Sequence, residues 1–350
     1  MRSEGEARSL ELVTDAVHTT DVQVASDETE ASRRDAPDPM LTDDERAALE
    51  EAAESMRGGL TKVKLIGPDL GPSGWAGGAR TPDGRIYFAP WSAPTVLCFD
   101  PATGESCHIG DFGGIYKYNQ AVLGADGAIY FVPFSARRVL RLDPKTHEMK
   151  FIGSDYGSRF GKWGRGVLMS DGCVVAPPSS ATKVLCIDTR AQSTSLIGSD
   201  YAREGFAKWS NAVLAPDGRV YCLPMDARQF LCIDPGSKAT SLVGDDLGIT
   251  AGKYISAAVV RGRLCCTPCN ARRALIFDPA DGSCRFIGKE LFGREMYIGS
   301  IIGIDSCVYG IPLSARQVIR IDPEAETVQP FGPDGLTGGF DGVLVPESGF

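Results

Sequence analysis

The sequence has little of what nucleic-acid-binding and membrane proteins require. Its 350 residues contain 36 Lys and Arg against 45 Asp and Glu, a formal net charge of −9. Nucleic-acid binding needs a basic excess, so this balance argues against such a partner. No apolar run approaches the ~20 residues that cross a bilayer, and Met1–Glu6 is too acidic for a signal or transit peptide. We therefore expect a cytoplasmic protein with neither a nucleic-acid nor a membrane partner.

Histidine is scarce as well, and cysteine is not placed as a disulfide scaffold would place it. The only histidines are His18, His108 and His147. Eleven cysteines are present, and many stand within apolar runs, as Cys98 and Cys222 do. An odd number of cysteines at apolar positions indicates reduced thiols inside a cytosolic protein. From these side chains we predict no catalytic residue and no metal site.

The negative charge is concentrated at the amino end. Residues 1–58 hold six arginines and sixteen acidic residues, and the rest of the chain is nearly neutral. Residues 1–41 are polar, acidic and aperiodic, which predicts a disordered tail. Thr42 to Glu45 form a capping box, so we predict a short helix or linker over residues 42–58, ending at Gly58–Gly59.

The remaining chain is built from a repeat that occurs six times with a period of 43 to 46 residues. In the fourth copy it runs from Asp217 to Gly244. A proline follows its second apolar run in every copy: Pro90, Pro133, Pro178, Pro224, Pro268 and Pro312. Ten residues after each proline comes an aspartate, and ten residues later a glycine, without insertion. A period of this length is typical of one propeller blade.

Each copy holds four short apolar runs, which we name strands a, b, c and d. Runs of three to six residues bounded by Gly, Pro and Asp are too short for helices. Asp-Gly between a and b predicts a tight hairpin turn, and Asp-Pro between c and d predicts a type I turn. The runs are apolar on both sides, as stacked sheets require. The sequence therefore predicts an all-β fold, a β-propeller of four-stranded antiparallel blades over residues 61–350.

The chain ends predict how the ring closes. Val63 to Ile66 match a lone strand d, and Val343 to Val345 match a lone strand a. We predict a seven-fold ring of six complete repeats and one partial closing blade, with a six-fold ring as the alternative. We expect a monomer unless another chain completes the partial blade by β-augmentation.

The repeat style, with Asp-Gly between strands a and b and Asp-Pro after strand c, resembles calcium-dependent lactonase and NHL-type propellers. In the lactonase type, the resemblance implies a calcium ion held by inward Glu, Asn and Asp. Asn211 and Asp341 match two of these ligands, and no Glu stands in the matching column. Ca²⁺ is therefore the cofactor only of an alternative interpretation, and otherwise we predict none.

The b–c loops and the d–a connections share one rim, where the copies differ most, and ligands bind preferentially on such loops. The predicted rim cations are Lys117, Lys162, Lys208, Lys253, Arg137, Arg228, Arg272 and Arg316. They could hold an anionic ligand. The alternative is that they recur in order to fix the blades together, through Asp–Arg pairing. Where strand a begins, the residue differs between most copies, and several of these residues are polar. We predict that the following ones contact a ligand at the channel mouth: Gln120, Arg165, Asn211, Ser256 and Asp341.

Two functions remain open from the sequence. The first is a cytosolic binding or scaffolding module that recognises a protein or a small ligand on the variable rim. The alternative is a metal-dependent hydrolase of the gluconolactonase-like type. Three or more carboxylate or amide oxygens converging on the axis would favour the hydrolase.

Overall fold

The computed structural model describes residues 74–303, 305–332 and 334–335, which form 24 strands and one 3-10 helix, η1 (Ala202–Glu204). Sheet 1 contains β1 (Trp75–Arg80), β2 (Ile86–Pro90), β3 (Val96–Asp100) and β4 (Glu105–Ile109). Sheet 2 contains β5 (Tyr118–Leu123), β6 (Ile129–Pro133), β7 (Val139–Leu142) and β8 (Met149–Ile152). Sheet 3 contains β9 (Val167–Leu168), β10 (Cys173–Ala176), β11 (Val184–Asp188) and β12 (Ser193–Ile197).

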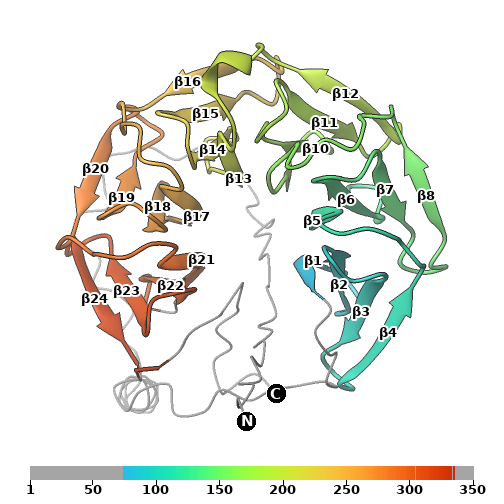
Figure 1. The fold of residues 1–350 in the computed structure, drawn as a ribbon, viewed down its shortest axis with the longest axis horizontal. Coiled ribbons are helices and arrows are strands. Elements are labelled where there is room, and N and C mark those ends of the chain that lie inside the picture. The colour runs from blue at the N-terminus through green and yellow to red at the C-terminus, as the bar shows by residue number, and fades with distance from the viewer. Residues whose placement is uncertain (1–73, 304, 333, 336–350) are drawn as a thin grey trace, which may run out of the picture. The chain divides into compact units, whose positions relative to one another are not determined.

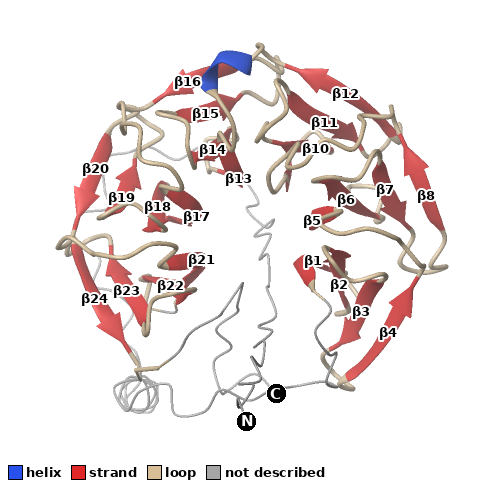
Figure 2. Cartoon of the chain, viewed as in Figure 1, coloured by secondary structure: helices blue, strands red, loops and turns tan. Residues whose placement is uncertain are grey.

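The second half of the chain repeats this plan. Sheet 4 contains β13 (Trp209–Leu214), β14 (Val220–Pro224), β15 (Phe230–Ile233) and β16 (Thr240–Val243). Sheet 5 contains β17 (Tyr254–Val260), β18 (Arg263–Pro268), β19 (Ala274–Phe277) and β20 (Cys284–Ile287). Sheet 6 contains β21 (Tyr297–Ile302), β22 (Val308–Pro312), β23 (Val318–Asp322) and β24 (Thr327–Phe331). All six sheets are antiparallel meanders, as the repeat predicts (Figure 2).

The turn residues account for this regularity. The glycine of each a–b Asp-Gly turn has a positive φ, for example +79° at Gly218, a conformation that costs glycine nothing. In the c–d turns the aspartate side chain accepts backbone N–H groups, as Asp322 does from Glu324 and Ala325. Four residues after that aspartate, the chain again takes a positive φ in every copy, at Gly104, His147, Gln192, Lys238, Gly282 and Glu326.

The sheets pack face to face in chain order, with strand a innermost and strand d outermost (Figure 1). A separate cluster of buried apolar side chains lies between each two consecutive sheets. The two largest side chains that are fully buried are Trp163, four residues before β9, and Trp209, the first residue of β13. Strands b and c are almost wholly buried, whereas strand d is largely exposed, as in β4 and β16. The expectation of strands that are apolar on both sides therefore fails for the outer strand, which has solvent beyond it.

The same aromatic–proline pairing fixes the register of every sheet. Its six instances are Trp75↔Pro90, Tyr118↔Pro133, Trp163↔Pro178, Trp209↔Pro224, Tyr254↔Pro268 and Tyr297↔Pro312. In all but sheet 3 the register shifts just after this pair, which is the mark of a β-bulge. The shift lies directly before Gln120 and Ser256 and spans Asn211, which are three of the predicted channel-mouth residues.

Several predictions fall on residues that the structure does not describe. These are the tail over 1–41, the helix over 42–58, the two closing strands Val63 to Ile66 and Val343 to Val345, and Asp341. The seven-fold ring, its six-fold alternative and the domain boundaries therefore stay predictions.

Candidate functional site

The four predicted rim lysines lie beneath the variable rim rather than on its surface. Lys117, Lys162, Lys208 and Lys253 are 1 to 6% exposed. Each ammonium group donates to the backbone carbonyl three residues earlier, at Gly114, Arg159, Gly205 and Thr250. Burial lowers the pKa of Lys162 and Lys208 to about 8. In this geometry the lysines close the ends of the d–a connections, and their contact with a ligand stays a prediction.

Lys208 and Lys253 each donate to three carbonyls, and two of the three hydrogen bonds of Lys208 are the shorter ones. Besides Gly205, the ammonium group of Lys208 donates to the carbonyls of Ser179 and Ala181, both at 2.8 Å. Those two residues belong to the b–c loop of sheet 3, whereas Gly205 precedes sheet 4. The side chain therefore ties two consecutive sheets together at the rim.

The four predicted rim arginines each pair with an acidic residue 18 positions later. The pairs are Arg137–Asp155, Arg228–Asp246, Arg272–Glu290 and Arg316–Asp334. All of these side chains are at least 37% exposed. Exposed pairs contribute little to stability. They join the b–c loop of a sheet to the connection that leaves the same sheet.

Three of the predicted channel-mouth residues lie on strand a, namely Gln120 on β5, Asn211 on β13 and Ser256 on β17, and Arg165 stands two residues before β9. Gln120 is half-buried and donates to the carbonyl of Ala121, and Ser256 is 8% exposed. An isolated parallel bridge joins Arg165 to Asn211 and so brings sheets 3 and 4 together. A role of these residues in binding stays a prediction.

Sequence reasoning missed a cluster of four aromatic rings on the rim over the first two sheets. Trp91 and Phe134 come from b–c loops, and Tyr116 and Phe160 come from d–a connections. The ring centroids form a closed circuit, with separations of 5.1 Å for Trp91–Tyr116, 5.7 Å for Tyr116–Phe160, 5.0 Å for Phe160–Phe134 and 4.8 Å for Phe134–Trp91. We call these four residues the rim aromatic cluster.

The cluster faces solvent. Tyr116 is 38% exposed and Phe160 is 50% exposed, and the neighbouring Ile115 is 61% exposed. The apolar surface continues toward sheet 4 through Phe206, over which the Arg159 guanidinium stacks at 5.8 Å. The signal in the sequence is the residue after the repeat's proline, which is aromatic only in the first two copies, as Trp91 and Phe134.

Tyr116 is held in an unfavourable backbone conformation. Its φ is +54°, in the left-handed region that favours glycine. Glycine occupies the same position in two sister connections, as Gly161 and Gly252, with Ala207 and Glu295 in the other two. The left-handed conformation costs a residue other than glycine ~1 kcal/mol. Because all five connections take this conformation, it belongs to the repeat, and the exposed ring is what distinguishes Tyr116 from its sister positions.

A hollow of about 690 Å³ lies beside the rim aromatic cluster. Its lining includes Ile115, Lys117, Ser135 and the ion pair Arg137–Asp155. Within the described part of the chain, the Ser135 hydroxyl oxygen is buried without a hydrogen-bond partner. The equivalent hydroxyl of Ser180 donates to the Phe160 carbonyl. The hollow therefore offers an apolar wall and a charged edge.

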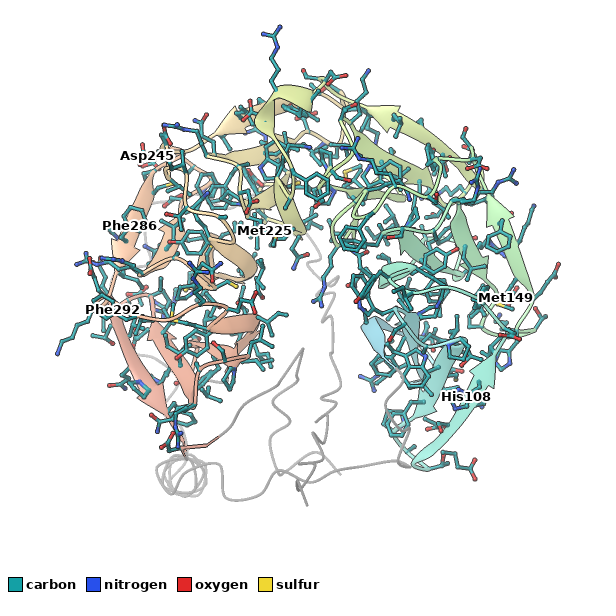
Figure 3. The ribbon with its side chains drawn as sticks, in the orientation of Figure 1. His108, Met149, Met225, Asp245, Phe286 and Phe292 are labelled. Atoms are coloured by element: carbon teal, nitrogen blue, oxygen red, sulfur yellow. The ribbon has the colours of Figure 1, made fainter. Side chains whose placement is uncertain are left out.

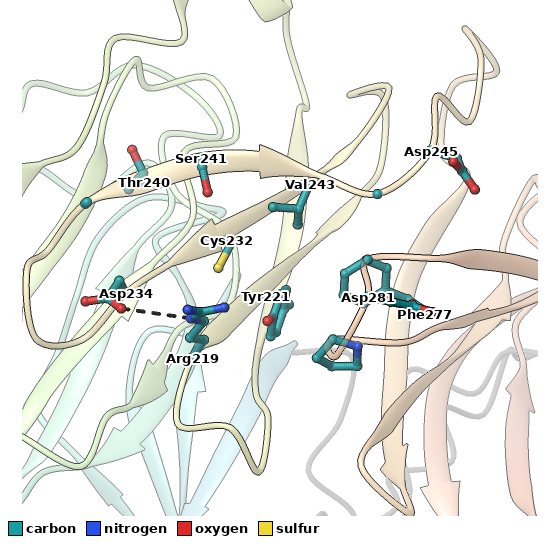
Figure 4. A pocket seen from close by; sticks show the side chains of 14 residues that line it. Arg219, Tyr221, Cys232, Asp234, Thr240, Ser241, Val243, Asp245, Phe277 and Asp281 are labelled. Atoms are coloured by element: carbon teal, nitrogen blue, oxygen red, sulfur yellow. Dashed lines mark ion pairs between the residues drawn. The ribbon is translucent and has the colours of Figure 1, made fainter.

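A second hollow, of about 630 Å³, lies between sheets 4 and 5 (Figure 4). Tyr221 and Asp234 line it from sheet 4, and the turn at Asp281–Gly282 lines it from sheet 5. Arg219 Nε lies 3.9 Å from a carboxylate oxygen of Asp234 across its floor. This hollow is formed at the uniform c–d turns, far from the loops in which the copies differ.

Among the described residues, one group of His, Cys, Asp and Glu side chains has three ligand atoms within 4.8 Å of one another: Cys98, Cys107 and His147. It lies between sheets 1 and 2, away from the channel mouth. In the same part of the chain, no three carboxylates converge on the axis. No helix among the described residues is long and apolar enough to cross a bilayer.

No protein-family model and no curated protein sequence matches this chain. Solved structures do match its fold. Virginiamycin B lyase from Staphylococcus aureus has a TM-score of 0.64 at 11% identity, over 77% of this chain and 88% of that one. Kuenenia stuttgartiensis hydrazine synthase has a TM-score of 0.57 at 13% identity, over 83% and 94% of the two chains. The extracellular domain of the putative one-component system BT4673 from B. thetaiotaomicron has a TM-score of 0.56 at 10% identity, over 77% of this chain and 38% of that one.

The fold is a β-propeller. The six four-stranded antiparallel sheets and these neighbours confirm the architecture that the repeat predicts. At such low identity the likeness concerns the fold alone. The propeller's function must therefore be argued from its own residues.

Proposed function

We propose that this propeller is a cytoplasmic binding module whose rim aromatic cluster receives an apolar side chain from a partner protein. The observation that carries the proposal is the closed circuit of four rings, two of them substantially exposed. Exposed apolar patches on folded proteins mark interaction sites. All eleven cysteines lie within the described residues and carry free thiols, which supports the reducing setting.

The energetics suit an anchor residue. Burying one Leu, Phe or Met side chain contributes about 1.5–3 kcal/mol, and aromatic pairs add about 0.5–1.5 kcal/mol each. Arg159 and the Arg137–Asp155 pair surround the apolar centre. An apolar centre with Arg at its edge is the usual anatomy of a protein interface.

The shape favours a protein over a small ligand. A small-molecule site buries 70–90% of its ligand in a concavity. Here Phe160 and Phe206 are each 50% exposed, and the apolar surface extends across connections before sheets 2, 3 and 4. A surface of this breadth suits a partner segment that spans several loops, whereas the hollow lined by Ser135 would take only part of it.

The test compares two exposed phenylalanines. Phe160 and Phe286 are both 50% exposed, and Phe286 lies on β20, on the outer strand of sheet 5 (Figure 3). We expect the parent protein and Phe286→Asp to capture the same partner from a lysate of the source cells. Phe160→Asp should lose it and should bind the purified partner at least about 10-fold more weakly, a loss of about 1.4 kcal/mol.

Two results would contradict the proposal. Equal capture by both variants would place the contact elsewhere. Loss of capture by Phe286→Asp alone would place it on the outer strand. Circular dichroism and melting curves of both variants control for unfolding.

A further inference from the structure

Two cysteines face each other on the outer strands of sheet 1. Cys98 on β3 and Cys107 on β4 are direct partners in the antiparallel register. His147, from the turn between β7 and β8 of the next sheet, brings its ring to them, so that one atom of each of the three lies within 4.8 Å of the others. Figure 3 labels His108, next to Cys107, and Met149, two residues after His147, which mark the two elements that meet there.

His147 occupies a position that reaches back to the preceding sheet. Its φ is +59°, and glycine holds the same place in two sister turns, Gly104 and Gly282. Where the residue is charged, it meets an opposite charge on the sheet before: Lys238 pairs with Asp171, and Glu326 with Arg285. His147 instead meets the two thiols, and its Nε2 lies 3.4 Å from the Tyr87 hydroxyl.

The combination occurs once among the six sheets. At the position of Cys98 the other sheets carry Arg141, Cys186, Cys232, Ile276 and Arg320, and opposite these stand Lys150, Ser195, Ser241, Arg285 and Gln329. No other sheet therefore places two thiols face to face. A feature needed only for the architecture would recur with the repeat, as the aromatic–proline pairs do.

The chemistry of the three ligand atoms is that of a soft-metal site. Two thiolates and an imidazole suit Zn²⁺, which binds in tetrahedral geometry with Zn–S bonds of about 2.3 Å and Zn–N bonds of about 2.0 Å. Such bonds place ligand atoms roughly 3.5–3.8 Å apart, so the observed spacing requires only small side-chain movements. Calcium, which takes oxygen ligands, does not fit this group.

We propose that Cys98, Cys107 and His147 bind one Zn²⁺ ion that braces sheet 1 against sheet 2, with water in the fourth position beside Tyr87. On binding, both thiols lose their protons, so two protons are released for each ion. The ion would link an exposed outer strand, β4, to the next sheet. This site lies apart from the rim aromatic cluster and does not depend on the binding function proposed above.

The experiment uses the full chain with matched variants. His147→Gly places glycine where two sister turns already have it, at Gly104 and Gly282, so this variant should fold. Cys107→Ser alters an exposed residue, and Cys284→Ser, on β20, is the control thiol. Zinc content is measured after purification without chelator. The apo-protein is then titrated with Co²⁺, whose thiolate charge-transfer absorption reports sulfur ligation.

We expect about one zinc per chain in the parent and in Cys284→Ser. His147→Gly and Cys107→Ser should bind zinc more than about 100-fold more weakly. This exceeds the loss of about 10- to 100-fold expected for a residue that only supports a metal ligand. Chelator should lower the melting temperature of the parent but not that of His147→Gly. Zinc retained equally by both variants, or Co²⁺ binding without thiolate absorption, would overturn the proposal. A Cys98–Cys107 disulfide in protein purified under reducing conditions would overturn it as well.

Discussion

Lys208→Met tests whether the buried lysines hold the rim together. The substitution keeps most of the aliphatic stem and removes the ammonium group, which donates to the carbonyls of Ser179, Ala181 and Gly205 at 2.8, 2.8 and 3.2 Å. A buried acceptor left unsatisfied costs about 1–3 kcal/mol. The substitution also removes the cost of burying a charged group, which offsets part of this loss in stability. We expect a net loss of about 2 kcal/mol, or roughly 5 °C in melting temperature.

The difference in unfolding free energy between the parent and Lys208→Met should also change with pH in a definite direction. Burial lowers the pKa of Lys208 from 10.5 to about 8, so in the window between these values the unfolded chain holds a proton that the native protein has released. Stability therefore rises with pH across this window in the parent and not in Lys208→Met. The free-energy gap between the two should widen from pH 8 toward pH 10.5.

Urea unfolding of the parent, Lys208→Met and the control Lys150→Met, whose side chain is exposed on β8, measures both effects. A loss no larger than that of the control would show that the ammonium group is not a structural tie. A gap that narrows as the pH rises would contradict the lowered pKa.

Three further predictions concern the scaffold. The Asp322 carboxylate accepts the N–H groups of Ala325 and Glu324, which lowers its pKa, so Asp322→Asn should be less stable than the parent at pH 7. In melting curves recorded at decreasing pH, the difference in stability should vanish as the pH falls below 3.8. A difference that persists there would refute the charge effect. Trp209→Phe should lose about 2–3 kcal/mol in urea unfolding, because it leaves a cavity and removes the 2.9 Å bond to the Gln229 carbonyl; a loss below about 1 kcal/mol would be contrary to this packing. Removal of residues 1–58 should leave the melting temperature unchanged, since none of the 24 strands uses them, and a large fall would be the contrary result.

Much of the fold could be predicted because its signals are local. Asp-Gly turns, Asp-Pro turns and the proline that ends strand b recur at fixed spacing, and each acts on its immediate neighbours. The burial of strand d could not be predicted in the same way. Apolar residues such as Leu242 appear in its pattern, yet no sheet covers its outer side, and Leu242 is 37% exposed.

The candidate site was harder to predict because it depends on contacts between distant loops. The sequence shows Lys208 next to Trp209, but only the fold shows that the ammonium group turns under the rim to meet carbonyls. The rim aromatic cluster joins residues from 91 to 160, and the three residues of the proposed zinc site come from two sheets. No periodicity in the sequence encodes such distances. The pairing of the rim arginines with acidic residues was predicted from their recurrence, but as a contact between blades, whereas each pair joins the b–c loop of a sheet to the connection that leaves the same sheet.

The most direct test of the central proposal places a photo-crosslinking amino acid, p-benzoylphenylalanine, at position 160 and, in a separate variant, at position 286. Both positions carry half-exposed phenylalanines, so the two probes have the same access to solvent. Irradiation in the source cells should link position 160 to one partner protein and leave position 286 without that adduct. The same adduct formed from position 286 with equal yield, or none from position 160, would contradict a binding site at the rim aromatic cluster.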